Sequence, residues 1–231
     1  MKKLVVLTGA GISAESGIKT FRDMGGLWEE YDVMEVASPQ AWERDPELVL
    51  RFYNDRRRQL GTVNPNAGHK ALAQLEKDFD VHIITQNVDN LHERAGSSKI
   101  LHLHGELTKV RSTRYPELIY DVGYKDIHIG DYCDKGAQLR PHIVWFGEAV
   151  TAIPDAAAIA QQADVLAVVG TSLNVYPAAG LIDYASPQVP VFLVDPNDVP
   201  VYSGHDVTFI KEPASTGVPK MIELIRARLG N

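Results

Sequence analysis

LVVLTGAGISAESGI, residues 4–18, is the stretch of sequence that decides the fold of this chain. Its first five residues form an apolar run of the kind found in strands buried inside a parallel sheet. Gly9, Gly11 and Gly17 follow, although without the usual G-x-G-x-x-G spacing and without a phosphate-loop lysine. A buried strand that leads through a glycine-rich turn into a helix is how dinucleotide-binding folds hold a pyrophosphate, because N–H groups there point at the anion. The stretch therefore predicts an α/β nucleotide-binding domain.

The composition is that of an ordinary globular protein. The chain has 231 residues and is 45% hydrophobic, which suffices for one sizeable core or for a core and a small lobe. Its net charge of -7 argues against nucleic acid and anionic membrane as partners, and no apolar run is long enough to span a bilayer. Cys133 is the only cysteine, which excludes an internal disulfide and favours a cytoplasmic location. Strand-like sequence from Leu4 leaves no room for a signal peptide.

Strand and helix patterns alternate along the chain, which favours an α/β fold with a doubly wound, Rossmann-like parallel sheet. Apolar runs typical of strands occupy residues 4–8, 81–85, 99–103, 165–169 and 190–194. Helical patterns occupy residues 47–60, 153–162 and 218–229, and a further helix is expected from Asn64-Pro65 to residue 76. Asp45 and Pro46 supply a capping acceptor and a first-turn proline to the helix at 47–60.

Polar or glycine residues follow five of the apolar runs. They are Gly9, Gln86, His104, Gly170 and Asp195. The carboxyl ends of parallel strands meet at one edge of the sheet, and ligands of doubly wound folds bind there. We therefore expect these residues to line one site.

Five separated motifs carry a resemblance to a known family. They are TFRD at 20–23, TQNVDNLH at 85–92, HLHGE at 102–106, WFGE at 145–148 and GTS at 170–172. In this order they resemble the sirtuins, the NAD-dependent protein-lysine deacylases. The chain is most similar to the bacterial desuccinylase and deacetylase (class III-like) type, although it lacks the zinc cysteines. The resemblance covers nearly the whole chain and implies NAD as a co-substrate.

Two segments, residues 24–62 and 107–141, interrupt the alternation of strand and helix. The resemblance implies that these two insertions form a second, smaller lobe. The NAD-binding Rossmann-like domain would then comprise residues 1–23, 63–106 and 142–231.

His104 is the first catalytic candidate. It precedes a glycine at a predicted strand end, and imidazole titrates in the range suited to a general base. The resemblance implies that His104 takes a proton from an NAD ribose hydroxyl, which then attacks an alkylimidate formed from the acyl oxygen and the anomeric carbon. The alternative is a hydrogen-bonded structural histidine. His102 is expected, by strand alternation, to point to the opposite face and to have a structural role.

Gln86, Asn87 and Asp89 form a dense polar cluster whose groups suit ribose hydroxyls and a carboxamide, because amides both donate and accept. The resemblance implies that Asn87 is catalytic and that Asn87 and Asp89 serve the nicotinamide pocket. The alternative for Asn87 is capping of a helix that starts near Val88. The full NAD-binding set that the resemblance implies is Gly9, Ala10, Gly11, Ser13, Ala14, Glu15, Ile18, Phe21, Arg22, Trp28, Gln86, Asn87, Val88, Asp89, Gly170, Thr171, Ser172, Asp195, Pro196, Asn197 and Ala214.

A substrate peptide is expected to bind as an added strand, with main-chain hydrogen bonds and loose sequence specificity. The resemblance implies that its acyl-lysine is clamped between two segments that contain Val144, Phe146, Gly147 and Glu148 on one side and Val175 on the other.

The acyl group itself is predicted from Tyr53 and Arg56. These residues lie three apart on a predicted helix and share a face, and a phenol with a guanidinium makes a carboxylate receptor. The resemblance implies a succinyl or malonyl pocket, with Ala37 as the small residue that leaves room for a longer chain. The alternative is that the charge run at residues 56–58 lies on a solvated helix face.

A zinc site is not predicted. Sirtuins commonly hold a structural zinc with four cysteines, but this chain offers Cys133 alone, and Ser112 stands where a first cysteine is expected. The spacing of His128 and His142 suggests no site either. The apolar segment 118–124 is expected to hold the small lobe together instead.

These observations together predict an NAD-dependent protein-lysine deacylase that acts on acylated-lysine proteins or peptides. It would prefer acidic acyl groups such as succinyl, deacetylate as a second activity, and release nicotinamide and O-acyl-ADP-ribose. Two alternatives stay open: protein mono-ADP-ribosyl transfer, and a non-catalytic NAD or ADP-ribose binding module.

Overall fold

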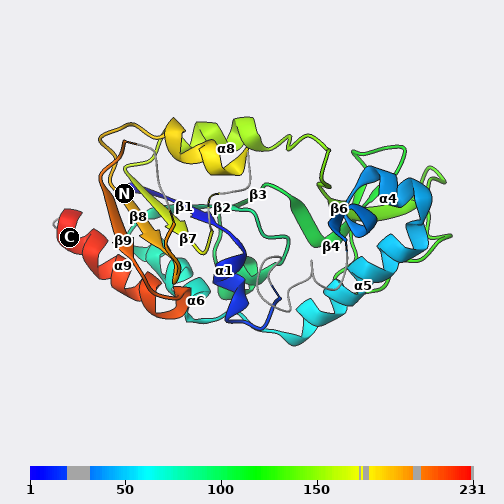
Figure 1. The fold of residues 1–231 in the computed structure, drawn as a ribbon, viewed down its shortest axis with the longest axis horizontal. Coiled ribbons are helices and arrows are strands. Elements are labelled where there is room, and N and C mark those ends of the chain that lie inside the picture. Colours follow the sequence, from blue (N-terminus) through cyan, green and yellow to red (C-terminus); the bar gives the residue numbers. More distant parts are fainter. Residues whose placement is uncertain (20–31, 172, 174–176, 200–203, 230–231) are drawn as a thin grey trace.

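The computed structural model describes residues 1–19, 32–171, 173, 177–199 and 204–229. A parallel six-stranded sheet with the order β3-β2-β1-β7-β8-β9 forms the larger part (Figure 1). Its strands are β1 Lys3–Thr8, β2 Asp80–Thr85, β3 Ile100–His102, β7 Val165–Val169, β8 Val191–Val194 and β9 Val207–Ile210. The predicted fold class is confirmed, and each apolar run named above overlaps one strand to within a residue at either end. β9 was not predicted, because it is a short edge strand and only Ile210 in it is buried.

Helices cover both faces of this sheet (Figure 1). α6 (Ala67–Gln74), η1 (Leu75–Lys77) and α9 (Ala214–Leu229) pack on the face that Leu4 and Val6 of β1 present. α8 (Ile153–Ala160) and η2 (Ala178–Tyr184) pack on the other face, with Val5 and Leu7. β1 is central and apolar on both faces, as a buried parallel strand must be.

The second part is built on an antiparallel sheet with the order β5-β4-β6. It contains β4 (Gly105–Ser112), β5 (Ile119–Asp121) and β6 (Leu139–Ile143). The helices α3 (Val33–Val36), α4 (Pro39–Arg44) and α5 (Pro46–Thr62) precede it in the chain, and α4 and α5 lie beside it at the right of Figure 1. On this arrangement we propose the two-lobe division. The proposed boundary at 62/63 falls at the end of α5, and those at 106/107 and 141/142 fall inside β4 and β6.

Helix starts follow the capping side chains. Asp45 accepts from the Leu48 N–H at the start of α5, as predicted. The α6 prediction was wrong at its start, because Asn66 rather than Asn64 accepts from the Gly68 N–H and the helix begins at residue 67. α9 begins four residues before the predicted position 218, and it accommodates a proline at residue 219 for the loss of one intrahelical hydrogen bond. Within the described part of the chain, every helix is too short or too polar to cross a bilayer.

Candidate active site

The glycine turn after β1 packs directly against the turn after β7. The Gly9 N–H donates to the Val169 carbonyl at 3.1 Å, and the Gly11 N–H donates to the Gly170 carbonyl at 2.8 Å. A Cβ on Gly11 would lie 2.7 Å from the Gly170 Cα atom, and Gly170 itself has a φ of +63°. Glycine is required at both positions by this close approach of two backbones. Ala10 and Ala14 are the ends of the short helix α1 (Ala10–Ala14) that follows.

The polar residues after β2 reach back to this turn. The Asn87 amide donates to the Gly9 carbonyl at 3.0 Å and to Ser13 Oγ at 3.2 Å, and Ser13 Oγ donates to Asp89 Oδ2 at 2.8 Å. All three side chains are buried, and burial raises the pKa of Asp89. Gln86 donates to Thr171 Oγ1 at 3.1 Å, which ties this cluster to the turn after β7.

Asn87 does not cap a helix, so the alternative proposed for it is wrong. The helix after the cluster, α7 (Leu91–Ala95), begins later than expected, and Asp89 Oδ1 accepts from the Leu91 N–H at 3.0 Å. Val88 packs partly buried against the hydrophobic cluster that contains Tyr53 and Trp145. Its carbonyl accepts from the Leu107 N–H at 2.7 Å.

His104 is held in one tautomer. Its Nδ1 lies 2.9 Å from the Gln86 carbonyl oxygen, and a carbonyl can only accept, so Nδ1 carries the proton and Nε2 keeps its lone pair. Burial lowers the pKa of His104 below its ordinary value, which keeps the ring neutral at neutral pH. This arrangement can accept a proton at Nε2.

His102 does not point away from His104. Its Nδ1 lies 3.0 Å from the Asn87 carbonyl, next to the carbonyl that His104 contacts. The expectation of opposite faces was wrong, because residues two apart on an extended chain share a face.

The turn after β8 and the start of α9 supply the other predicted nucleotide contacts. Asp195 is buried, and its Oδ1 accepts from the Asn197 N–H at 2.8 Å, while Pro196 and Asn197 are exposed. Ala214 is buried at the start of α9. Glu15 accepts from the N–H and the hydroxyl of Ser215 and thereby joins α1 to α9.

The predicted acyl side gathers around α5. Ala37, Tyr53 and Trp145 lie in one buried cluster, against which Ile18 packs partly buried. The Trp145 indole N–H donates to the Tyr53 hydroxyl at 3.1 Å, and burial raises the pKa of Tyr53, so this phenol stays protonated.

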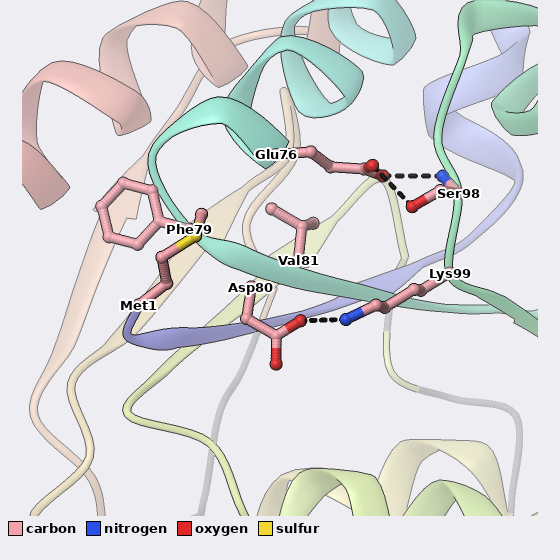
Figure 2. A pocket seen from close by; sticks show the side chains of 7 residues that line it. All are labelled: Met1, Glu76, Phe79, Asp80, Val81, Ser98 and Lys99. Carbon is pink, nitrogen blue, oxygen red and sulfur yellow. Dashed lines mark hydrogen bonds and ion pairs between the residues drawn. The ribbon is translucent and has the colours of Figure 1, made fainter.

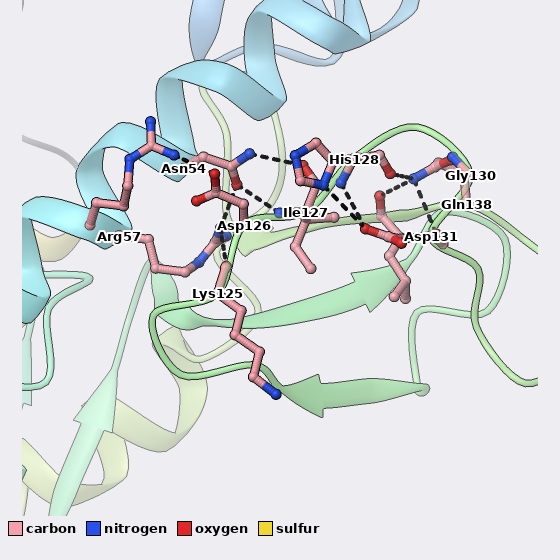
Figure 3. Close-up of polar contacts among 11 residues, drawn as sticks. Asn54, Arg57, Lys125, Asp126, Ile127, His128, Gly130, Asp131 and Gln138 are labelled. Carbon is pink, nitrogen blue, oxygen red and sulfur yellow. Dashed lines mark hydrogen bonds and ion pairs between the residues drawn. The ribbon is translucent and has the colours of Figure 1, made fainter.

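Arg56 faces this side with unused donors. Its guanidinium lies 5.0 Å from the Phe52 ring centroid, and its Nε and Nη1 are buried with no hydrogen-bond partner among the described residues. The alternative of a solvated charge run fits only Arg58, whose side chain is 52% exposed. Arg57 is fully buried and donates to the Leu107 and Lys125 carbonyls and to Asn54 Oδ1 (Figure 3).

The WFGE motif is fixed by an ion-pair network that the sequence did not indicate. Glu148 accepts from Arg140 at 2.8 Å and from the Trp145 N–H at 2.8 Å, and the Arg140 guanidinium lies 3.2 Å from the Trp145 ring centroid. Phe146 is half exposed, and Gly147 has a φ of +92°. Glu148 therefore shapes this turn from inside it.

The backbone of residues 144–146 connects His104 to Ala37, which lies on the predicted acyl side. The Val144 N–H donates to the His104 carbonyl at 2.9 Å, and the Phe146 N–H donates to the Ala37 carbonyl at 3.0 Å. Five predicted residues, Phe21, Arg22, Trp28, Ser172 and Val175, lie outside the described residues.

Comparison with known proteins decides the family. The sequence model of the Sir2 family matches residues 9–177. The chain belongs to the Sir2 family. Among its curated relatives, the NAD-dependent protein deacylase of Bacteroides thetaiotaomicron is 54% identical over 233 residues, with 97% of this chain and 98% of the relative covered. The deacylase of the same name from Helicobacter pylori is 55% identical over 228 residues, with 97% and 99% covered.

Solved sirtuin structures share this fold. A Sir2 homologue variant in complex with ADP-ribose superposes with a TM-score of 0.89 at 39% identity, covering 99% of this chain and 94% of that one. A Sir2 homologue in complex with NAD gives a TM-score of 0.87 at 40% identity, with 99% and 91% covered. A Sir2 variant with a deacetylated peptide and an acetyl-ADP-ribose gives 0.80 at 30% identity, with 96% and 92% covered.

The residues that stand near the usual sirtuin zinc position do not form a thiolate set. Cys133 Sγ donates to Ser112 Oγ at 3.3 Å, and the same oxygen accepts from the N–H groups of Arg114 and Tyr115. His128 is exposed, and His142 lies on β6. A serine hydroxyl is not a usual zinc ligand, so the one thiol leaves a four-cysteine zinc site three ligands short.

An open groove elsewhere on this sirtuin does not belong to the site. Figure 2 shows it at the amino ends of the strands, where Met1, Phe79 and Asp80 contribute to its lining. Gly9, Gln86, Gly170 and Asp195 follow the carboxyl ends of strands of the parallel sheet, so the groove lies at the other edge of that sheet.

Proposed function

We propose that this chain is an NAD-dependent protein-lysine deacylase that uses His104 as its general base and prefers acidic acyl groups. The observation that carries the proposal is the fixed tautomer of His104, because Nδ1 donates to the Gln86 carbonyl and the Nε2 lone pair can therefore accept a proton. The curated relatives named above are NAD-dependent protein deacylases, and they cover nearly the whole chain.

The polar set at the sheet edge fits NAD as the co-substrate. The amides of Gln86 and Asn87 and the carboxylates of Asp89 and Asp195 offer the donors and acceptors that ribose hydroxyls and a carboxamide need. In this proposal Asn87 and Asp89 orient the nicotinamide end, Asp195 receives the adenosine ribose, and the remaining predicted contacts line the nucleotide between them.

The acyl preference rests on Arg56. The buried Nε and Nη1 atoms of its side chain lack partners among the described residues, and buried unpaired donors are costly unless a ligand satisfies them. A carboxylate at the end of a succinyl or malonyl chain would supply the charged acceptor that this guanidinium lacks among the described residues. Tyr53 would stand beside it as a neutral phenol, and Ala37 would leave space for the chain.

We also propose that an acylated-lysine peptide pairs with the backbone around residues 144–148, and that the fold needs no zinc. A cytoplasmic location is proposed from the one free thiol, Cys133. No nucleic acid or membrane enters this proposal.

The test compares removal of succinyl and acetyl groups from one lysine peptide by mass spectrometry, with NAD and a chelator present. Arg56→Met should reduce desuccinylation roughly tenfold or more, because a charge-assisted pair is lost, while deacetylation changes little. Arg58→Met is the matched control on the same helix and should leave both rates alone. Equal loss of both activities in Arg56→Met would reject the carboxylate receptor.

His104 is tested separately. His104→Tyr should lower deacylation by about 100-fold or more, the usual contribution of a general base, while NAD still binds. Binding of NAD without turnover by the unmodified protein would favour a binding module. Nicotinamide release that does not need an acylated lysine would favour ADP-ribosyl transfer.

A further inference from the structure

The loop that carries Asn87 is held by an unusual set of donors. Four consecutive carbonyl oxygens, those of residues 85–88, all accept from the segment 102–107. The pairs are Leu103 N to Thr85 O at 2.9 Å, His104 Nδ1 to Gln86 O at 2.9 Å, His102 Nδ1 to Asn87 O at 3.0 Å and Leu107 N to Val88 O at 2.7 Å. Two of the four donors are therefore histidine rings, and of these the His102 ring can give up its Nδ1 proton while it keeps one on Nε2.

The His102 ring has an acceptor at each nitrogen. Nδ1 faces the Asn87 carbonyl at 3.0 Å, and Nε2 faces Glu93 Oε1 at 2.7 Å. A neutral imidazole has one N–H and can satisfy only one of them, whereas an imidazolium satisfies both. The His102 side chain is only 8% exposed, so water does not replace a lost partner easily.

We infer that His102, charged through its pair with Glu93, is a positioning residue that holds the Asn87 carbonyl and thereby sets the Asn87 side chain at the nicotinamide end of the site. The inference rests on the proposed function, because the role of Asn87 toward nicotinamide belongs to it. The Asn87 amide donates to the Gly9 carbonyl and to Ser13 Oγ, so hydrogen bonds hold both its backbone and its side chain.

The charges around His102 favour its protonated form. Glu93 on α7 contacts it, and Glu106 on β4 and the buried Asp89 act on it from a longer distance. Lys109 pairs with Glu106 at 2.6 Å, and the buried His92 is kept neutral, so neither cancels the effect of Glu93. Burial opposes the charge, yet the pKa of His102 is raised above its ordinary value through the Glu93 contact.

Loss of the second proton has a defined consequence. A carboxylate is a stronger acceptor than a carbonyl, so the remaining proton stays between Nε2 and Glu93, and the Asn87 carbonyl loses its donor. The hold on Asn87 is therefore complete below the ordinary histidine pKa and is lost as the pH rises through the raised pKa. We expect kcat/KM for NAD to fall on this alkaline side.

Three substitutions separate the two contacts. In His102→Asn the amide nitrogen takes the place of Nδ1, so the Asn87 carbonyl keeps a donor that does not titrate. In His102→Gln the amide takes the place of Nε2, so only Glu93 keeps a partner. In Glu93→Gln the new amide can donate to a neutral His102, which leaves Nδ1–H on the Asn87 carbonyl at every pH.

The experiment measures the affinities for NAD and for ADP-ribose by calorimetry and the pH profile of kcat/KM, with chelator present. His102→Gln should weaken the binding of NAD roughly tenfold, because a charge-assisted hydrogen bond to the Asn87 carbonyl is lost. The affinity for ADP-ribose, which lacks the nicotinamide, should not change. His102→Asn and Glu93→Gln should keep the ratio of the two affinities and lose the alkaline fall. His82→Gln is the control, because His82 pairs with Asp80 far from this loop.

The outcomes distinguish this inference from the proposed function. Equal weakening of NAD and ADP-ribose in His102→Gln, or an alkaline fall that persists in Glu93→Gln and His102→Asn, overturns the inference while deacylation stands. The expected affinity ratios in a protein that does not deacylate would support the inference and reject the deacylase. Because Glu93 is partly exposed, Glu93→Gln gives a result even if a His102 variant fails to fold.

Discussion

Three consecutive arginines on α5 meet three different environments. Arg58 forms exposed ion pairs with Asp55 and Asp126. Arg57 is fully buried, and its Nε and Nη1 donate to the Leu107 and Lys125 carbonyls and to Asn54 Oδ1, while its Nη2 has no partner among the described residues. Figure 3 shows it beside Asn54 and Lys125, and burial lowers its pKa to about 10. Arg56 keeps two buried donors without partners in the described structure. Three identical residues in a row therefore have different roles: Arg57 is a buried structural residue, Arg58 is a solvated charge and Arg56 is a candidate carboxylate receptor.

Arg57→Met should destabilise the protein by about 3 kcal/mol or more, because three acceptors beside the small antiparallel sheet lose their donor. Arg58→Met removes the same charge from the next residue and should change the free energy of unfolding by less than about 1 kcal/mol, since exposed ion pairs contribute little. Urea denaturation of the two variants and the unmodified protein measures the difference. Equal changes in the free energy of unfolding of the two variants would show that Arg57 is not the stabilising residue that these contacts indicate.

The small sheet lacks the thiolates of a zinc site, and its turns are closed by hydrogen bonds. Ser112 Oγ accepts from Cys133, Arg114 and Tyr115, and Leu50, Val110 and Leu139 are among the residues of the core beneath. Leu118, Tyr120 and Val122 pack partly buried against this core, as expected for the apolar segment 118–124.

At this element we expect that a strong chelator leaves the melting temperature unchanged, whereas Ser112→Ala lowers the stability by about 1–2 kcal/mol because a shared acceptor is removed. Calorimetric scans with and without chelator test the first statement, and urea denaturation tests the second. Native mass spectrometry that finds one zinc per chain, together with a chelator-dependent loss of stability, would contradict the metal-free lobe.

The elements that could be predicted are those whose signal is local. β1, β2, β7 and β8 are apolar runs buried on both faces, and α5 has its cap and its first-turn proline in the sequence. The small sheet has mixed exposure, as the alternating burial of β4 shows, so its strands gave no continuous apolar run.

At the site, the motifs predicted that Gln86, Asn87 and Asp89 lie near the glycine turn, where the structure places them, but the partners of other motif residues come from far along the chain. Glu93 on His102, Arg140 on Glu148 and the burial of Arg57 depend on pairs that no local pattern reports. The error about His102 was different, because a correct use of the strand period would have placed it on the side of His104.

At the scale of the whole molecule, two buried neutral histidines connect helices α6 and α7 to β1 and to the glycine turn that follows it. His69 of α6 and His92 of α7 have ring centroids 4.9 Å apart, and His92 Nε2 lies 3.0 Å from Thr8 Oγ1 of β1. His69 also approaches Ser13 Oγ at 3.5 Å. Burial lowers the pKa of His69 to about 4 and that of His92 well below its ordinary value.

These histidines should make the fold sensitive to acid. Below the ordinary histidine pKa, these histidines are protonated in the unfolded chain but stay neutral in the native protein. The free energy of unfolding therefore falls as the pH decreases, until the pH reaches the lowered pKa of the native protein. For His69 this loss amounts to about 2 kcal/mol between about pH 7.5 and about pH 5. In His69→Asn the side chain does not titrate. Its free energy of unfolding should therefore fall by about 2 kcal/mol less than that of the unmodified protein over the same pH range. Urea denaturation of both proteins at the two pH values checks this, and parallel losses would mean that the acid sensitivity originates elsewhere.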